Sequence, residues 1–560
     1  MRTKRHVPGG DTRNNREERR FKGRGLRRAL LGITGLSVAI VLTGCALLPQ
    51  IGATGGGDAP EQSSEGNAYV NQEPEWTTCH EDGLVCAAVE APLDWDDPEG
   101  ESITLSLIKR EAEGTKLGSL FYNPGGPGFS GVDDYSVSHP GATGIAVKEH
   151  YDVISWDTRG VAGVLGSSTP VECLDATGLD DYLYGGSEAS SNARGSEEWV
   201  AAKVAAAGEF SAACAERTGD LLAHVDTRST VQDLEMLRQI VGDEQLNFLG
   251  EDYGTYIGAL YADTYPDKVG RMVLDGALDP SVTNFEVSLA QAAGMERMLR
   301  MYVEDCLKQT DCPLTGTTDE ALQSIRTIMD ALDAKPGVAA DGRPVSSGTF
   351  LNALLVTLTD RYTWIVPGYI FEGAVDGDYA NVMEFADMAV GRYDGEYTSN
   401  YVEAFAATTC LDTVTAHDPA KIRAQAAEIE AAAPILGSYM AYSDIECAEW
   451  PYPGPNEATA VTAAGAQPIL VLSATDDPVY PHAWSESLAD QLESAELVSF
   501  VGESHGIYGT SPCVNTVVNE YFMEGVVPAK DPKCTEADDE KMRADGYDGT
   551  SQWPLELDLE

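Results

Sequence analysis

Short apolar runs alternate with amphipathic stretches in the first and last parts of this 560-residue chain. A continuous apolar run bounded by turn residues indicates a buried strand, and helical periodicity indicates a helix packed against it. The runs typical of strands are residues 103–109, 118–122, 151–156, 247–249, 271–274, 468–473 and 497–501. Helices are expected at residues 197–217, 229–241, 256–265 and 483–492. This alternation predicts the α/β class, with a mostly parallel, doubly wound sheet.

The strand pattern fades between residues 284 and 401, where helical periodicity dominates. We expect helices there at residues 287–307, 320–334, 349–358 and 371–390. A helical cap inserted between sheet strands explains this pattern, and such a cap limits the size of a substrate. The alternative is a helical packing domain with no lid role. The predicted organisation is a core at 76–283, the cap at 284–401, a segment at 402–535 that completes the core, and a loose acidic tail at 536–560.

The strand at residues 247–249 leads into Gly250-Glu251-Asp252-Tyr253-Gly254 and then into a helix. This is the layout of the nucleophile elbow of the α/β-hydrolase fold, Gly-X-Ser-X-Gly, whose two glycines make room for a tight turn. The central residue here is Asp252 instead of serine. A glycine-rich turn at residues 123–131 follows an earlier strand, where this fold places half of its oxyanion hole. The expected oxyanion donors are therefore the backbone N–H groups of Gly126 and Tyr253.

The remaining catalytic groups of this fold follow in the order acid, then histidine, each after a strand. Asp477 follows the strand at 468–473, and His505 follows the strand at 497–501. The residues between them leave room for one helix and one strand, as the pattern shows. We prefer Asp477 to Asp476 as the acid because Asp477 precedes Pro478. The predicted catalytic set is thus Asp252, Asp477 and His505.

These motifs together resemble the secreted tripeptidyl aminopeptidases and related prolyl-aminopeptidase-like serine exopeptidases of actinobacteria. The resemblance covers about Trp76 to Cys534 and implies an α/β-hydrolase fold that releases short peptides from free N-termini. The family's elbow carries a serine at the position of Asp252. Glu251 is a candidate partner for a substrate amino group, and the alternative is a structural hydrogen bonder behind the elbow. The motifs that carry the resemblance are Asn123–Gly128, Trp156–Gly160, Gly250–Thr255, Leu274–Gly276, Cys306–Leu314, Asp477–Pro481, His505–Gly506 and the stretch from Cys513 to Cys534.

An aspartate at the elbow changes the chemistry that is available. Losing a triad serine typically costs on the order of a millionfold in turnover, and a second carboxylate on His505 favours its imidazolium form. Three interpretations follow. In the first, the protein is a degenerate hydrolase that binds peptides without cutting them. In the second, Asp252 attacks the sp³ carbon of an epoxide or alkyl halide, and a histidine-activated water hydrolyses the resulting ester. In the third, the chain is a tethered structural or interaction lipoprotein.

The N-terminus reads as a targeting segment. Basic residues, including Arg19-Arg20 that resembles a twin-arginine export signal, precede an apolar run from Ala29 to Leu42. The run ends in Leu42-Thr43-Gly44-Cys45, which resembles the bacterial lipobox. We therefore predict a lipoprotein signal peptide at 1–44, lipid on Cys45 and a flexible tether at 45–75. The protein would be exported and anchored to the extracytoplasmic face of the cell membrane.

Charge and cysteine content agree with export. The formal net charge of −53 excludes nucleic acid as a partner, so the expected partners are a peptide or other small-molecule substrate and the membrane. No metal or cofactor motif is present, and none is expected. Ten cysteines remain after Cys45, and neighbouring ones are expected to pair in an oxidising compartment. The predicted disulfides are Cys79–Cys86, Cys173–Cys214, Cys306–Cys312, Cys410–Cys447 and Cys513–Cys534.

Overall fold

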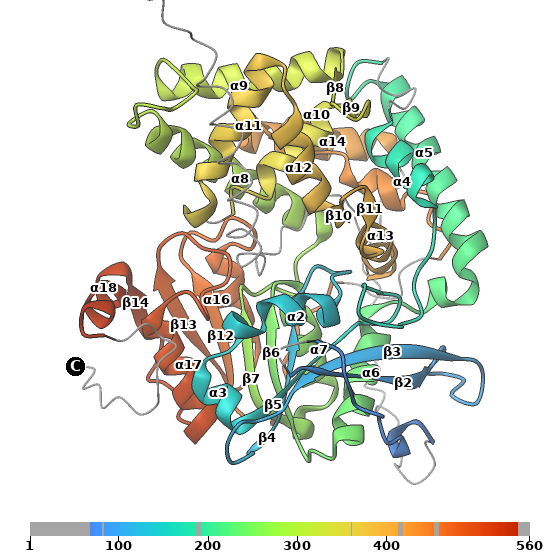
Figure 1. Cartoon of the computed structure of the whole chain (residues 1–560), viewed down its shortest axis with the longest axis vertical. Helices are drawn as coiled ribbons and strands as arrows, with labels where there is room; N and C mark the ends of the chain where they lie inside the picture. Colours follow the sequence, from blue (N-terminus) through green and yellow to red (C-terminus); the bar gives the residue numbers. More distant parts are fainter. Residues whose placement is uncertain are drawn as a thin grey trace, which may run out of the picture.

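The computed structural model describes residues 68–546, apart from 81–82, 186–191, 360, 413–417 and 453–457. The predicted signal peptide, the lipidation site at Cys45, most of the tether and the end of the acidic tail lie outside the described residues. Two layers are visible in Figure 1: a sheet with helices on both faces, and above it a mass of helices.

A ten-stranded sheet forms the core, in the order β1-β2-β3-β5-β4-β6-β7-β12-β13-β14. From β5 to β14 all neighbours are parallel, whereas β1, β2, β3 and β5 pair antiparallel. The mostly parallel, doubly wound sheet predicted from the sequence is therefore confirmed. The strands are β1 (Thr77–Thr78), β2 (Val85–Pro92), β3 (Ser102–Arg110), β4 (Gly118–Asn123), β5 (Tyr151–Trp156), β6 (Leu246–Glu251), β7 (Val269–Asp275), β12 (Ile469–Ala474), β13 (Ala495–Val501) and β14 (Lys533–Thr535).

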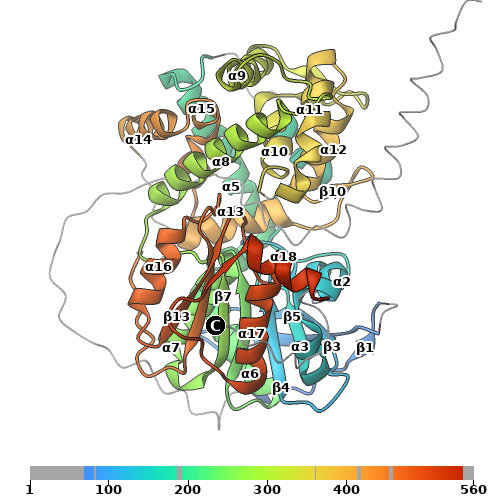
Figure 2. The same ribbon diagram turned by 90° about the vertical axis from the view of Figure 1, so that its left-hand side faces the viewer.

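Apolar side chains of the sheet pack against helices on both faces. One buried cluster joins the sheet to α6 (Thr227–Val241), α7 (Tyr253–Thr264) and α16 (His482–Gln491). A second cluster joins the opposite face to α2 (Gly131–Ala142), α3 (Ile145–His150) and α17 (Pro512–Glu524). Figure 2 shows the sheet edge-on between these two sets. This arrangement leaves the ends of the strands, where the elbow lies, facing the second layer of helices.

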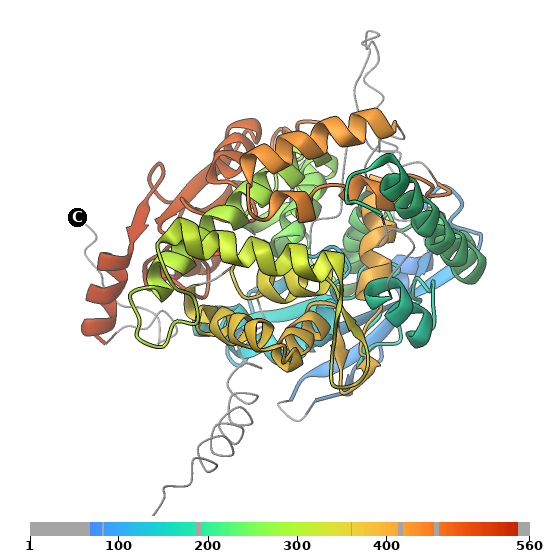
Figure 3. The same ribbon diagram turned by 90° about the horizontal axis from the view of Figure 1, so that it is seen from above.

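The second layer is the cap, and it has an apolar core of its own. Figure 3 shows it from above, spread over the sheet. Its helices are α8 (Asn284–Cys306), α9 (Thr318–Ala334), α10 (Ser347–Leu355), α11 (Ile365–Asp376), α12 (Ala380–Ala389), α14 (Pro419–Ala432) and α15 (Gly437–Met440). Two short hairpins, β8 (Gly337–Val338) with β9 (Pro344–Val345) and β10 (Arg392–Tyr393) with β11 (Glu396–Tyr397), connect some of them.

Three helices lie between the two layers or leave the core to join the cap. Trp199 and Ala207, on α5 (Glu197–Thr218), pack against Ile422 and Ile445 in the cap segment, so α5 and the preceding α4 (Ala176–Tyr184) stand beside the cap helices. Helix α13 (Tyr401–Asp412) instead packs into the core cluster beneath the cap. The cap layer thus includes segments on both sides of the predicted 284–401 range.

One predicted helix is two helices in the structure. Residues 371–390 were expected to form a single helix, but α11 ends at Asp376 and α12 begins at Ala380. Gly377 has a φ of 71° and caps α11 in the left-handed conformation, which glycine adopts without steric cost.

The two ends of the described chain are more ordered than the sequence suggested. Ala68–Asn71, in the predicted tether, forms a short 3-10 helix, and the Gln72 side chain exchanges hydrogen bonds with the backbone of Glu90. At the other end, Glu536–Ala544 forms α18, where a loose tail was expected. Thr535 and Asp538 form its capping box, and buried Asp539 accepts a hydrogen bond from Ser511. Both segments have a composition typical of flexible chain, and in both the structure shows polar contacts to the core.

All five predicted disulfides are present. In the described part of the chain no helix is both long and apolar enough to cross a membrane. The same residues contain no cluster of three or more His, Cys, Asp or Glu side chains placed to hold a metal ion.

Candidate active site

Asp252 occupies the tight turn between β6 and α7. Its backbone has φ 53° and ψ −123°, a conformation that L-residues rarely adopt. A Cβ atom added at Gly250 would lie 2.4 Å from the carbonyl oxygen of Gly254, and one added at Gly254 would lie 2.6 Å from that of Asn123. The two glycines are therefore required for the turn, as in a nucleophile elbow. The turn holds the Asp252 side chain at the sheet's edge, beneath the cap.

The structure brings Asp252, His505 and Asp477 into contact. His505 Nε2 lies 3.0 Å from Asp252 Oδ2, and His505 Nδ1 lies 3.0 Å from Asp477 Oδ2. The backbone N–H groups of Val479 and Tyr480 donate to Asp477 Oδ1 and fix its orientation. The three side chains are 1%, 4% and 0% exposed, in the order Asp252, His505, Asp477. All three side chains are therefore enclosed in this structure.

The carboxylate of Asp252 also occupies one of the two predicted oxyanion donors. The backbone N–H of Gly126 donates to Asp252 Oδ1 at 3.0 Å. Gly125 approaches so closely that a Cβ atom there would lie 2.7 Å from the same oxygen. One carboxylate oxygen thus lies in the hole and the other lies against the histidine, in the place of a serine hydroxyl. A substrate carbonyl oxygen has no access to the Gly126 N–H in this arrangement.

Electrostatics fix the protonation state of His505. Burial alone lowers the pKa of the imidazole, but the Asp477 and Asp252 carboxylates outweigh burial and raise that pKa well above its ordinary value. His505 is consequently an imidazolium that donates both N–H groups to carboxylates. An imidazolium cannot take a proton, so the free site lacks a general base.

Two tyrosines that the sequence analysis did not assign lie at the same site. The phenol of Tyr480 interacts electrostatically with the Asp252 carboxylate, and its ring packs edge-to-face on His505 with the centroids 5.6 Å apart. Tyr401, at the start of α13, interacts electrostatically with Asp252 and stacks on Phe129 of the glycine-rich turn, with 4.5 Å between the ring centroids. Burial raises the pKa of both phenols, so both are protonated at neutral pH. Only the position of Tyr480 three residues after Asp477 pointed to its location.

Glu251, the candidate amine-binding residue, belongs to a group of carboxyls behind the elbow. The Tyr122 hydroxyl donates to Glu251 Oε2 at 3.0 Å and lies 3.4 Å from Asp134 Oδ2. Burial, Asp275 and Asp134 together raise the pKa of Glu251 well above its ordinary value. Burial also raises the pKa of Asp134 and of Asp275 to about 6. The hydrogen bond to Tyr122 corresponds to the structural interpretation of Glu251.

Asp275 holds the loop that carries the histidine. Its carboxylate accepts hydrogen bonds from the backbone N–H groups of Ile507 and Tyr508, at 2.7 to 3.0 Å. Since Asp275 ends β7, these bonds tie the His505 loop to the sheet next to the elbow. The position of the imidazole is therefore set by the core and not by the cap.

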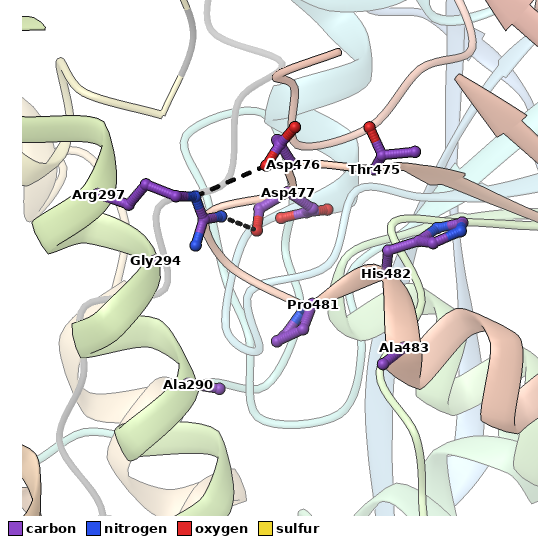
Figure 4. A pocket seen from close by; sticks show the side chains of 9 residues that line it. All are labelled: Ala290, Gly294, Arg297, Thr475, Asp476, Asp477, Pro481, His482 and Ala483. Atoms are coloured by element: carbon purple, nitrogen blue, oxygen red, sulfur yellow. Dashed lines mark hydrogen bonds and ion pairs between the residues drawn. The ribbon is translucent and has the colours of Figure 1, made fainter. Parts of the chain in front are cut away.

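A cavity of about 270 Å³ lies beside the loop of the catalytic acid, between α8 and the start of α16 (Figure 4). Arg297 reaches across it from α8, donating to the backbone carbonyl of Asp477 at 3.3 Å and lying 3.8 Å from the carboxylate of Asp476. Neither Asp252 nor His505 lines this cavity, so it is not the chamber in which they act. Its lining residues are Ala290, Gly294, Arg297, Thr475, Asp476, Asp477, Pro481, His482 and Ala483.

The chain is similar to several known hydrolases and peptidases. Residues 433–534 match a family model described as TAP-like protein. Serine protease Hip1 of Mycobacterium tuberculosis is 30% identical over 91% of this chain and 98% of its own length. Carboxylesterase B of the same species is 32% identical over 91% of this chain and 99% of its own. Tripeptidyl aminopeptidase of Streptomyces lividans is 28% identical over 82% of this chain and 86% of its own.

Among solved structures, an α/β-hydrolase fold protein from Chitinophaga pinensis aligns with 82% of this chain and 99% of its own at 10% identity, with a TM-score of 0.31. The sheet order, the elbow and the order of Asp252, Asp477 and His505 are those of the α/β-hydrolase fold. With relatives that match over nearly their whole length, the chain belongs to the peptidase-like α/β-hydrolase family of the actinobacterial tripeptidyl aminopeptidases and serine protease Hip1.

Proposed function

We propose that this protein binds short peptides beneath its cap without cleaving them by the serine-peptidase route. One observation carries the proposal: the Asp252 carboxylate occupies both the position of the nucleophile, against His505, and the oxyanion hole, against the Gly126 N–H. Acyl transfer needs a nucleophile beside a neutral base and a vacant hole for the developing oxyanion. This site provides neither.

The expected loss of peptidase activity is large. Replacing the triad serine in a peptidase of this kind costs on the order of a millionfold in turnover. A scaffold without its nucleophile usually retains about 10³- to 10⁴-fold over water from its oxyanion hole and binding. Here Asp252 Oδ1 fills the hole, so even that residual rate should fall. Attack by a carboxylate on an amide would moreover give a mixed anhydride, which lies too high in energy to accumulate.

Peptides are the proposed ligands because the relatives include a tripeptidyl aminopeptidase and a serine protease. The strongly acidic chain favours ligands that carry a positive charge, such as a free peptide N-terminus. We therefore propose recognition of the free α-amino group of a short peptide.

Calorimetric titration of the purified protein with a tripeptide and with its N-acetylated form tests this proposal. We expect the free tripeptide to bind more tightly and to be recovered intact by mass spectrometry. Equal affinity for the two forms would contradict recognition of the amino group. Release of cleavage products by the parent protein would contradict the proposal that peptides bind without being cleaved.

We further propose that the protein is exported and anchored to the membrane by lipid on Cys45. The lipobox-like Leu42–Cys45 and the five disulfides, which require an oxidising compartment, support this location. Fractionation of cells that express the protein tests it, with Cys45→Ala as the matched variant. We expect the parent in the membrane fraction as a lipidated species, and the variant without the lipid mass. Identical masses for the two would refute the anchor.

A further inference from the structure

We propose that Asp252 is a nucleophile toward epoxides, with Tyr480 as the proton donor to the ring oxygen. The carboxylate that blocks acyl transfer is suited to attack at an sp³ carbon, because its product is an ordinary ester instead of an anhydride. This inference rests on the geometry of the site alone. It does not depend on peptide binding.

The groups for attack and protonation lie in one cluster. The Gly126 N–H and the His505 imidazolium hold the Asp252 carboxylate in place. The Tyr480 ring packs edge-to-face on His505, and its phenol interacts electrostatically with the same carboxylate. An epoxide between carboxylate and phenol would present a carbon to Asp252 and its oxygen to Tyr480. Tyr480 is 4% exposed, so its proton is transferred without competition from bulk water.

The first step balances without any added reagent. An oxygen of Asp252 forms a bond to an epoxide carbon, the carbon–oxygen bond of the ring breaks, and the departing oxygen takes the Tyr480 proton. The Tyr480 phenolate then recovers a proton from the His505 imidazolium, whose ring packs against it with 5.6 Å between the centroids. The products are an uncharged ester on Asp252, a neutral His505 and a protonated Tyr480.

Ester formation itself converts His505 into a base. In the free protein two carboxylates keep the imidazole protonated. The ester removes the charge of Asp252, so only Asp477 still favours the imidazolium. The site therefore holds an acid during attack and a base afterwards, which a serine at the elbow would not provide.

The second step uses water and restores the starting state. Neutral His505 takes a proton from water, which attacks the ester carbonyl carbon. The resulting oxyanion lies at Oδ1, against the Gly126 N–H. When the tetrahedral intermediate collapses, the bond between the acyl carbon and the alcohol oxygen breaks. The departing alcohol oxygen takes the proton of the newly formed Asp252 carboxylic acid. His505 remains an imidazolium. The net reaction adds one water to the epoxide and releases a diol.

The surroundings define the class of epoxide. Phe129, Tyr401 and Tyr480 are aromatic, and the catalytic side chains are at most 4% exposed. Aromatic walls around a closed site fit a small apolar or aryl epoxide better than a charged one. Styrene oxide is a suitable probe.

The experiment follows diol formation from styrene oxide by the full-length protein at neutral pH. A single turnover is run in water labelled with heavy oxygen. We expect diol in excess of the buffer reaction. The label should appear in the tryptic peptide that contains Asp252, and the first diol should be unlabelled, because its new oxygen comes from the carboxylate.

Variants separate the roles of the residues. Asp252→Asn should abolish diol formation, and Tyr480→Phe should lower kcat by about 10²- to 10⁴-fold, the usual contribution of a positioned general acid. Tyr439→Phe, which removes a hydroxyl that donates to Asp330 in the cap, is the matched control and should leave the rate unchanged. Melting curves of all three variants establish that each is folded.

Three results would overturn the inference. The first is the absence of diol above the buffer reaction with the parent protein. The second is diol formation that survives Asp252→Asn. The third is heavy oxygen found in the first diol and not in the Asp252 peptide, which would show direct attack by water. None of these results bears on peptide binding, which the titration measures separately.

Discussion

The protonation of His505 provides a direct test of the electrostatics of the site. We predict that Asp252→Asn lowers the pKa of His505, because the variant replaces one of two carboxylates by an amide of nearly the same shape. His505 Nε2 lies 3.0 Å from the carboxylate oxygen that is removed, and its Nδ1 keeps Asp477 as a partner. The change thus removes one charge and one of the two acceptor oxygens at residue 252, and His505 Nδ1 keeps its contact with Asp477.

The magnitude follows from that distance. Unit charges 3.0 Å apart attract by about 5 kcal/mol at the effective dielectric constant of about 20 that suits protein sites, before any cost of desolvation. An opposite charge at this range typically shifts a pKa by about 1 to 3 units after that cost. We therefore expect the pKa of His505 to fall by about 1 to 3 units in the variant, roughly 1.4 to 4 kcal/mol of stabilisation of the imidazolium.

Heteronuclear NMR of the imidazole nitrogens over a pH series measures this pKa in both proteins. A neutral His505 at neutral pH in the parent would refute the reasoning. So would a His505 pKa that does not change on Asp252→Asn.

Further predictions concern stability. Burial raises the pKa of Asp157 to about 7, above its unfolded value of about 4. The free energy of unfolding should therefore fall as pH rises from about 4 to about 7, and Asp157→Asn should flatten that part of a calorimetric pH profile. An unchanged slope in the variant would contradict this prediction. Asp233→Ala removes the carboxylate partner of the fully buried Arg159 and should lower the free energy of unfolding in urea by about 3 to 5 kcal/mol. A decrease of less than about 1 kcal/mol, as for exposed ion pairs, would show that water reaches Arg159. Replacing both Cys173 and Cys214 by serine opens a 41-residue loop and should cost about 4 kcal/mol by the chain-entropy estimate; an unchanged urea midpoint would contradict it.

The sequence sufficed for features that depend on local order. The elbow, the acid and the histidine each follow a strand, so their order along the chain predicts that they meet at one edge of a parallel sheet. The disulfides pair sequence neighbours, which made the five pairs predictable. The boundaries of most predicted strands agree closely with the structure for the same reason, because each strand is a continuous buried apolar run.

Other features depend on contacts between distant segments and had no local signal. Strand β2 has only a weakly apolar, alanine-rich run, and it is paired along its whole length with β3. Helix α5 stands beside the cap because Trp199 packs against residues more than 200 positions later in the chain, Ile422 among them. Nothing in the local sequence pattern indicates such a partner.

Side-chain orientation set the limit of prediction at the site itself. The sequence placed a carboxylate at the elbow and donors in the glycine-rich turn. It did not reveal that Asp252 Oδ1 would turn into the hole and bind the Gly126 N–H. Nor did it reveal that Tyr480 would meet the same carboxylate, because that contact depends on how the loop after Asp477 folds back over His505.

The most direct test of the central claim is to restore the serine. The parent protein and Asp252→Ser are compared under identical conditions on a panel of chromogenic peptide substrates with free N-termini, with Asp252→Asn as the isosteric control. The serine variant frees the hole and leaves His505 with one carboxylate partner. We predict that it cleaves peptides while the parent and Asp252→Asn do not. Cleavage by the parent at a rate equal to that of the serine variant would contradict the account.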